Sequence, residues 1–252
     1  MQFILSLMMA ASVGGVSGYL GSLMLSKRMA LSAGPLGHLT LPGIALAFLY
    51  GFDVSLGAFP FVILGIIFIW LFHMRTKLPM EALTAIVFAT GVAITFMFLP
   101  EEKTVSALIG DISQISPSAT AITVILCFII FLSTRNIFSK MILASISEDL
   151  AKVEGIDVRK DNLVYLGCIA LTVAFGVRIV GALLTAALVA IPACASRNLS
   201  TNLNQFSYGA MALGSLASIV GVVVFWLTGM APGPMIIMAS TSFFLISMAF
   251  VR

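Results

Sequence analysis

The chain has 252 residues, of which 60% are hydrophobic and only 9% are charged, with a net charge of +3. Soluble domains devote about a quarter of their residues to charge, so this chain cannot build a water-facing surface of ordinary size. The composition excludes an ordinary soluble enzyme, a disordered chain and a nucleic-acid binder with a clustered basic face. The three cysteines lie in apolar stretches without a CxxC pair, so neither a disulfide framework nor a zinc site is indicated.

Stretches without charged residues predict where the chain crosses a membrane, since a spanning helix needs about 20 apolar residues. The last stretch is long enough for two helices and is divided near Pro232 and Pro234. We predict an all-α polytopic membrane protein with eight or nine transmembrane helices, in which residues 1–252 form one transmembrane domain. Because of Arg178, 162–197 could form one broken span or two. The uncharged stretches are 1–26, 29–52, 54–74, 82–100, 112–134, 162–177, 179–196 and 198–251.

The first stretch, residues 1–26, has no basic segment before it and no small-residue cleavage signal. It is therefore predicted to be a retained span and not a removed signal peptide. Small residues recur in it every four positions, at Gly14, Gly18 and Ser22, and the same spacing occurs over 210–218. Small residues at this spacing let helices approach closely in lipid, which indicates a compact bundle.

The second stretch contains a histidine in a segment rich in glycine and proline. The prolines are Pro35 and Pro42, and three glycines including Gly43 lie beside them, which predicts a kinked or interrupted helix. An ionisable side chain inside a span suggests a functional site, and neutral imidazole can ligate manganese, iron or zinc. His38 is therefore a candidate metal ligand. The residues alone leave equally open that His38 only bonds a backbone carbonyl freed by Pro42.

The basic residues predict the orientation of the chain, because cytoplasmic loops carry an excess of Lys and Arg. If nine spans begin outside, eleven of the 13 basic residues are cytoplasmic, and only Lys103 and Arg178 are outside. We therefore predict a cell-membrane protein with its N-terminus outside and its C-terminus in the cytoplasm. The residues predicted to be cytoplasmic are Lys27, Arg28, Arg75, Lys77, Arg135, Lys140, Lys152, Arg159, Lys160, Arg197 and Arg252.

The charged segment 140–161 is predicted to hold a short amphipathic helix on the cytoplasmic side. Ser145 and Glu148 have the spacing of a capping box with Ser145 as the N-cap, and Gly155 predicts the end of the helix. Its polar face mixes both signs of charge, which favours docking of a cytoplasmic partner over an interfacial helix lying on lipid. The apolar residues predicted to share one face are Ile142, Ile146, Leu150 and Val153.

Two absences narrow the class of transporter. The chain has no GxxxxGK[ST] phosphate loop, so it is not predicted to hydrolyse ATP itself. It also has no paired carboxylates within its apolar stretches, which argues against a secondary transporter of the proton-relay kind. If transport is powered, the power must come from another subunit.

In order and spacing, these segments resemble the ABC-3 family of membrane permeases, which belong to zinc, manganese and iron importers. The resemblance covers nearly the whole chain. The matching segments are Gly14 to Gly21 followed by Lys27-Arg28, Gly37 to Ala47 around His38, Gly110-Asp111-Ile112, Glu148-Asp149-Leu150-Ala151 to Gly155, Gly181 to Ala193, and Pro232-Gly233-Pro234.

The resemblance implies a homodimeric, alternating-access permease that performs no covalent chemistry. It also implies an ABC ATPase subunit, an external metal-binding protein and surrounding membrane lipid as partners, with no nucleic acid. No permanently bound cofactor is implied, and the transported ion would be Zn²⁺, Mn²⁺ or Fe²⁺. The family's ATPase-coupling helix corresponds to Ser147, Glu148, Asp149, Leu150, Ala151 and Gly155, and the kink in the pathway corresponds to Pro35, Pro42 and Gly43.

The segment around His38 departs from the family pattern. Family members that carry metal have an aspartate four residues before the histidine, where this chain has Gly34, and a serine directly before it, where this chain has Gly37. Imidazole alone is a poor site because it lacks charge neutralisation and a hard oxygen ligand. Ser32, Thr40 or a backbone carbonyl near Pro35 could substitute. A metal chelate or another non-metal ligand is the alternative substrate.

Overall fold

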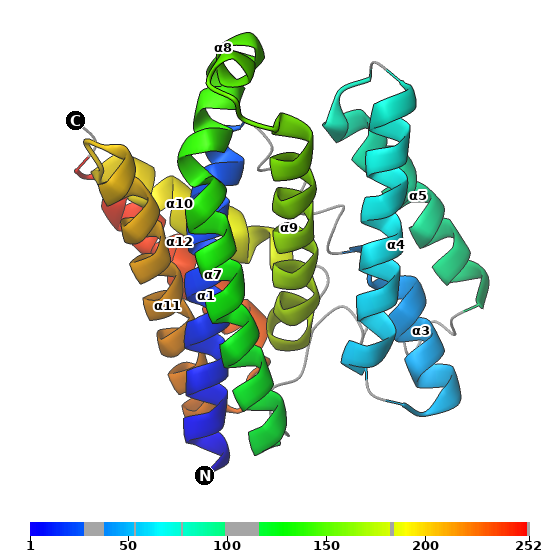
Figure 1. Cartoon of the computed structure of the whole chain (residues 1–252). Coiled ribbons are helices and arrows are strands. Elements are labelled where there is room, and N and C mark those ends of the chain that lie inside the picture. Colours follow the sequence, from blue (N-terminus) through cyan, green and yellow to red (C-terminus); the bar gives the residue numbers. More distant parts are fainter. Residues whose placement is uncertain (28–37, 53, 77, 99–115, 182–183, 251–252) are drawn as a thin grey trace.

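The structure is a computed structural model that describes residues 1–27, 38–52, 54–76, 78–98, 116–181 and 184–250. The described residues form helices joined by turns and contain no strand, which confirms the predicted all-α class (Figure 1). The helices are α1 (Gln2–Ser26), α3 (Leu41–Tyr50), α4 (Val54–Arg75), α5 (Met80–Phe98), α7 (Pro117–Ile146), α8 (Glu148–Val153), α9 (Val158–Val180), α10 (Thr185–Leu199), α11 (Leu203–Thr228) and α12 (Pro232–Met248).

Each predicted span holds one described helix, if 162–197 and 198–251 are each counted as two spans. Helix α9 continues through Arg178, and Gly181, with a φ of 85°, ends it before α10 begins. Five of the described helices are long and apolar enough to cross a membrane, namely α1, α4, α7, α9 and α11. Helices α5 and α12 are apolar but shorter. The chain is thus built as a multi-pass membrane protein.

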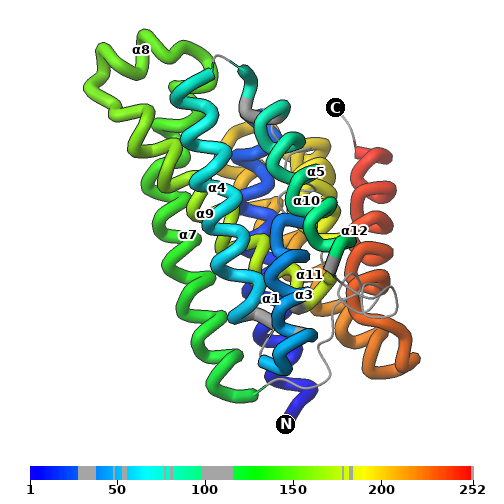
Figure 2. Tube along the Cα trace, turned by 90° about the vertical axis from the view of Figure 1, so that its right-hand side faces the viewer, coloured from blue at the N-terminus to red at the C-terminus, as the bar shows by residue number. Residues whose placement is uncertain are grey.

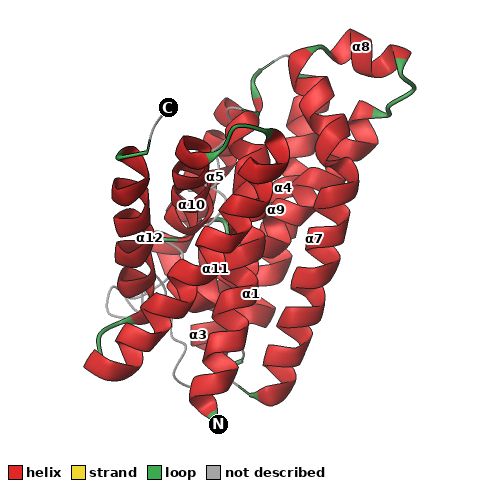
Figure 3. Ribbon diagram, turned by 90° about the vertical axis from the view of Figure 1, so that its left-hand side faces the viewer, coloured by secondary structure: helices red, strands yellow, loops and turns green. Residues whose placement is uncertain are grey.

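Helix α1 lies at the centre of one part of the bundle, where it packs against α7, α9, α10 and α11 (Figures 1 and 3). Its closest neighbour is α11, and small residues make their approach close. A Cβ atom on Gly18 would overlap the carbonyl of Ala210, and one on Gly14 would overlap Ser218. The predicted role of the four-residue spacing in helix packing is therefore confirmed for α1 and α11.

Helices α3, α4 and α5 pack together on the other side of α9 and join the rest of the bundle through contacts between α4 and α9 (Figures 1 and 2). Gly43 of α3 and Gly57 of α4 form a second close crossing, because a Cβ on either residue would overlap the backbone of the other. This crossing holds the start of α3, and with it the segment after His38, against α4 and α5.

Helix α7 has 30 residues, or roughly 45 Å at about 1.5 Å per residue. A hydrocarbon layer is about 30 Å thick, so α7 is long enough to extend beyond it. Helix α8 sits at the far tip of α7 (Figures 1 and 3). The same end of the bundle holds Lys27 after α1, Arg75 at the end of α4 and Arg159 at the start of α9.

Candidate functional site

Helix α8 begins at a serine cap directly after α7. Ser147 has extended backbone angles, and its Oγ accepts a hydrogen bond from the backbone N–H of Leu150 at 3.2 Å. The prediction of Ser145 as the N-cap is wrong, because α7 continues to Ile146 and the Ser145 Oγ donates to the carbonyl of Ile142 within it. The break between the two helices is therefore two residues later than the capping-box spacing suggested.

The end of α8 is fixed by a glycine turn. Gly155 has a φ of 74°, and its N–H donates to the carbonyl of Lys152 at 3.0 Å. The N–H of Ile156 donates to the carbonyl of Ala151, also at 3.0 Å. This pair of bonds is the Schellman arrangement, which requires a residue that tolerates positive φ. Gly155 stops the helix as predicted, and the segment becomes a defined projection of six residues.

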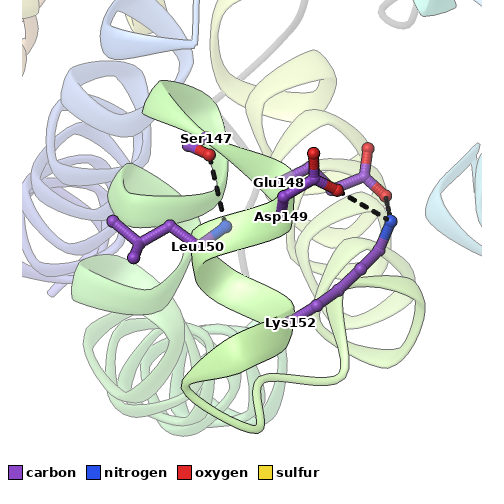
Figure 4. Close-up of polar contacts among 5 residues, drawn as sticks. All are labelled: Ser147, Glu148, Asp149, Leu150 and Lys152. Carbon is purple, nitrogen blue, oxygen red and sulfur yellow. Dashed lines mark hydrogen bonds and ion pairs between the residues drawn. The ribbon is translucent and has the colours of Figure 1, made fainter.

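The polar side chains of α8 lie on one exposed surface (Figure 4). The Nζ atom of Lys152 lies 3.1 Å from a carboxylate oxygen of Glu148 and 3.9 Å from one of Asp149. The Asp149 side chain is 98% exposed. Exposed pairs of this kind contribute little stability, so they can be exchanged for contacts with another molecule at small cost. The first turn also presents two carboxylates to the positive end of the helix dipole.

The four apolar residues predicted to share one face do not lie on a single helix. Ile142 and Ile146 belong to α7, whereas Leu150 and Val153 belong to α8 beyond the break. Ile146 is 77% exposed and Val153 is 83% exposed, whereas Ala151 between them is fully buried. Ala151 thus anchors α8 to the bundle, and the tip presents large apolar side chains outward. Apolar groups gathered on a projection are typical of a surface that another protein covers.

His38 lies just before α3, in a region lined by α5. A turn at Leu39 and Thr40 separates it from the helix, which starts at Leu41 with Pro42 in its first turn. The imidazole ring lies 5.3 Å from the ring of Phe88, measured between centroids, and is half-buried. Thr40 is fully buried beside it. His38 therefore faces an aromatic and apolar neighbourhood contributed by α5.

The other predicted members of the histidine segment lie partly outside the described residues. Ser32, Gly34 and Pro35 lie outside the described residues, as does the turn at 110–112. Among the residues that the structure describes, no group of three or more His, Cys, Asp or Glu side chains could hold a metal ion. Within that part of the chain, His38 therefore does not belong to a cluster of three or more such ligands.

Pro42 and Gly43 have distinct structural roles. Pro42 lies in the first turn of α3, where proline is compatible with a helix start because no N–H partner is lost. Gly43 packs against Gly57, a residue that the sequence analysis did not single out. Only the contact between α3 and α4 reveals this partner, since Gly57 stands in an otherwise ordinary apolar stretch. Helix α3 lies toward the end of the bundle opposite α8 (Figure 1).

Comparison with known proteins decides the family. A family model described as the ABC 3 transport family matches residues 1–251. The chain belongs to this family. It is 22% identical over 249 residues to the manganese transport system membrane protein MntC of Listeria innocua, with 97% of this chain and 89% of the relative covered. It is 24% identical over 245 residues to the high-affinity zinc uptake system membrane protein ZnuB of Buchnera aphidicola, with 92% and 91% covered.

The fold agrees with a solved structure of PsaBC from Streptococcus pneumoniae in complex with Fab. The TM-score is 0.81 at 25% identity, with 96% of this chain and 89% of that chain covered. As an ABC-3 permease, the chain is a multi-pass membrane subunit of an ABC transporter, and a separate ATPase subunit hydrolyses the ATP. The predicted family, fold class and non-enzymatic role are confirmed.

Proposed function

We propose that this permease forms a homodimeric, alternating-access pathway that imports a divalent metal ion, Zn²⁺, Mn²⁺ or Fe²⁺, delivered by an external binding protein. The end that carries α8 faces the cytoplasm, and the N-terminus lies outside. The gathering of Lys27, Arg75 and Arg159 at the α8 end supports this orientation through the excess of positive charge in cytoplasmic loops. The manganese and zinc systems named among the relatives support a metal as cargo.

The observation that carries the proposal is the form of α8. It is a capped, six-residue helix on the tip of a helix longer than the hydrocarbon layer is thick, and its large apolar side chains, Leu150 and Val153, are exposed. We assign it the role of docking the ATPase through Ser147 to Leu150, while the buried Ala151 and the turn at Gly155 hold the helix in place. ATP-driven closure of two ATPase subunits would push on α8 and, through α7, on the bundle.

We assign His38 a transient role in the metal pathway. It precedes a proline-started helix and lies beside the closely packed α3–α4 crossing, so its position is fixed by packing. Neutral imidazole is a suitable ligand for each of the three ions. No resident cofactor is proposed, because the ion is cargo. Thr40 and backbone carbonyls near Pro35 are the groups that could supply oxygen ligands.

The proposal is tested by metal uptake into vesicles that contain the permease, its ATPase and its binding protein. His38→Ala should abolish ATP-driven uptake of Mn²⁺, Zn²⁺ or Fe²⁺, because the imidazole would be lost from the pathway. His38→Cys keeps a metal ligand and should retain part of the uptake of Zn²⁺. Full uptake by His38→Ala, with an unchanged elution profile of the permease, would show that the histidine is structural.

A metal chelate is the second candidate substrate, and a specific observation favours it. Gly34 stands where metal-carrying members have aspartate, and the described residues hold no cluster of metal ligands. A chelate already carries the ligands of its metal ion. The permease would therefore need to provide space in the pathway and no carboxylate ligands. The discriminating measurement is the ATPase activity of the complex with loaded binding protein. Stimulation by a chelate and not by the free ions would replace the metal-ion proposal.

A further inference from the structure

A cavity of about 420 Å³ lies where α4, α8 and α9 meet, at the end of the bundle that carries α8. Sites for small ligands have volumes of about 300–1,000 Å³, so the cavity is large enough for one. Its lining combines apolar side chains with charged and amide groups. The lining residues are Trp70, His73 and Met74 of α4, Glu148 of α8, and Val158, Arg159 and Asn162 of α9.

The cavity lies at the ends of two candidate spanning segments, where we expect the membrane to meet water. On α4 it is lined by the last turns of the spanning segment Leu56–Arg75, and on α9 by the first turns of the segment Val158–Val177. Lipid headgroups occupy this level, and tryptophan is enriched there because its ring is apolar and its N–H is polar. Trp70 is partly buried against the core of the bundle. Lipid headgroups are therefore the most concentrated candidate ligands around this cavity.

One side of the cavity suits a phosphodiester. In the part of the chain that the structure describes, Lys152 is the basic partner in both ion pairs, so Arg159 lines the cavity without a carboxylate partner. The Nζ atom of Lys27 reaches from α1 and donates to the Oδ1 atom of Asn162 at 3.0 Å. The planar guanidinium group of arginine binds phosphate oxygens in a fork. A second basic side chain thus stands directly behind the amide group that lines the cavity.

The other side of the cavity suits a cation. Glu148 projects from α8, and its partner in the structure is Lys152, in a pair that is exposed on both sides. Such a pair is weak in water, so an incoming ammonium group can replace Lys152. Primary ammonium has three N–H donors for the carboxylate, whereas a quaternary choline group has none. An anionic headgroup such as phosphoglycerol would leave Glu148 without a partner.

We propose that the cavity binds the headgroup of phosphatidylethanolamine, with its phosphodiester on Arg159 and its ammonium group on Glu148. The lipid then bridges α8 to α4 and α9 through Glu148, while Asp149 and Leu150, which are exposed and do not line the cavity, remain available to the ATPase. The inference depends on the placement of the chain in a membrane and not on which substrate is transported. Failure of the metal proposal would therefore leave it untouched.

The test uses Trp70 as a reporter inside the cavity. The chain has two tryptophans, and the other, Trp226 on α11, contacts Phe3 at the opposite end of α1 from Lys27. The full-length Trp226→Phe chain in detergent would be titrated with dihexanoyl-phosphatidylethanolamine or dihexanoyl-phosphatidylcholine. We expect a saturable change in Trp70 emission with either lipid. The ethanolamine lipid should bind about tenfold more tightly than the choline lipid, because its ammonium group gains a hydrogen-bonded charge pair.

The charged residues should act on different parts of the headgroup. Arg159→Gln should weaken both lipids about tenfold, because they share the phosphodiester. Glu148→Gln should leave the affinity for the choline lipid unchanged. It should weaken binding of the ethanolamine lipid until both lipids bind with the same affinity. Lys160→Gln and Glu154→Gln are matched controls, because they neutralise neighbouring charges that do not line the cavity. Thermal unfolding of each variant checks that the bundle is folded.

Several results would overturn the assignment. Equal affinity for the two lipids, or an ethanolamine preference that survives Glu148→Gln, would remove the ammonium contact. Lipid binding unchanged by Arg159→Gln would remove the phosphodiester contact. Free phosphoethanolamine and inorganic phosphate should give no change at the same concentrations. If either binds as tightly as the lipid, the cavity is a site for a soluble anion and not for a membrane lipid.

Discussion

The crossing of α1 with α11 and the short helix α8 are held in place in different ways. At the crossing, Gly18 and Ala210 bring two long helices into backbone contact. At the tip, a six-residue helix is anchored mainly by Ala151, and its large side chains point outward. The crossing has no space for a larger side chain, whereas most of the surface of α8 is free to contact another molecule. A bundle that must transmit a push needs both.

Because of this difference, we expect mutations in the two regions to have different effects. Changes at the crossing should affect folding, because a backbone carbonyl cannot move aside as a flexible side chain can. Changes at the tip should affect association and coupling, because few contacts within the chain are lost.

The largest effect is expected for Gly18→Ala. The added Cβ would overlap the carbonyl of Ala210, so α1 and α11 would have to separate and the permease should lose most of its folded yield. Gly167→Ala on α9 is the matched control, since nothing lies within 4 Å of its Cβ position, and it should be neutral or stabilising by up to about 1 kcal/mol. Size-exclusion yield and thermal unfolding measure both. Normal folding of Gly18→Ala would contradict the close crossing.

A smaller and local effect is expected for Ser147→Ala. Losing an N-cap costs about 1 kcal/mol, so the amide of Leu150 should exchange its hydrogen about fivefold faster while the melting temperature of the bundle stays unchanged. Ser147→Asp should restore the protection, because a carboxylate is also an effective cap. Ser145→Ala is the control, since Ser145 bonds within α7. An equal effect of Ser145→Ala would place the cap where the sequence pattern first suggested it.

A pH-dependent effect is expected at Lys27, where burial lowers the pKa to about 8 from the usual 10.5. Between these values the unfolded chain binds more protons than the folded chain, so stability rises as the pH increases through this window. The cost of burying the charge is fully present below pH 8. In Lys27→Met the melting temperature relative to the unaltered chain should therefore fall from pH 8 to pH 10, with Lys160→Met as the control. A constant difference across that range would show that the charge carries no such cost.

Much of the fold could be predicted from the sequence because membrane spans depend on local composition. Uncharged stretches gave the positions of the helices, and Gly155 gave the end of α8. The fate of Arg178 could not be predicted, since a single charge inside an apolar region is compatible with a helix or with a break. The structure shows that α9 continues through it and ends at Gly181.

The candidate sites were predicted less evenly. The apolar spacing of Ile142, Ile146, Leu150 and Val153 is helical, but periodicity does not reveal a break that keeps the same spacing on both sides. The competing caps, Ser145 and Ser147, are separated by two residues, and only the backbone angles decide between them. The partner of Gly43 was missed because contacts between distant helices leave no local pattern. His38 could be singled out because ionisable residues are rare in spans.

The most direct test of the central claim is coupling in vesicles after charge reversal on α8. In the variant with Glu148→Arg and Asp149→Arg, we predict a folded permease whose metal uptake per ATP hydrolysed falls at least tenfold, because the docking surface would repel its partner. Lys140→Glu, a charge reversal on the exposed part of α7, is the control. Uptake per ATP equal to that of the unaltered complex would contradict the assignment of α8 as the element that couples the ATPase to transport.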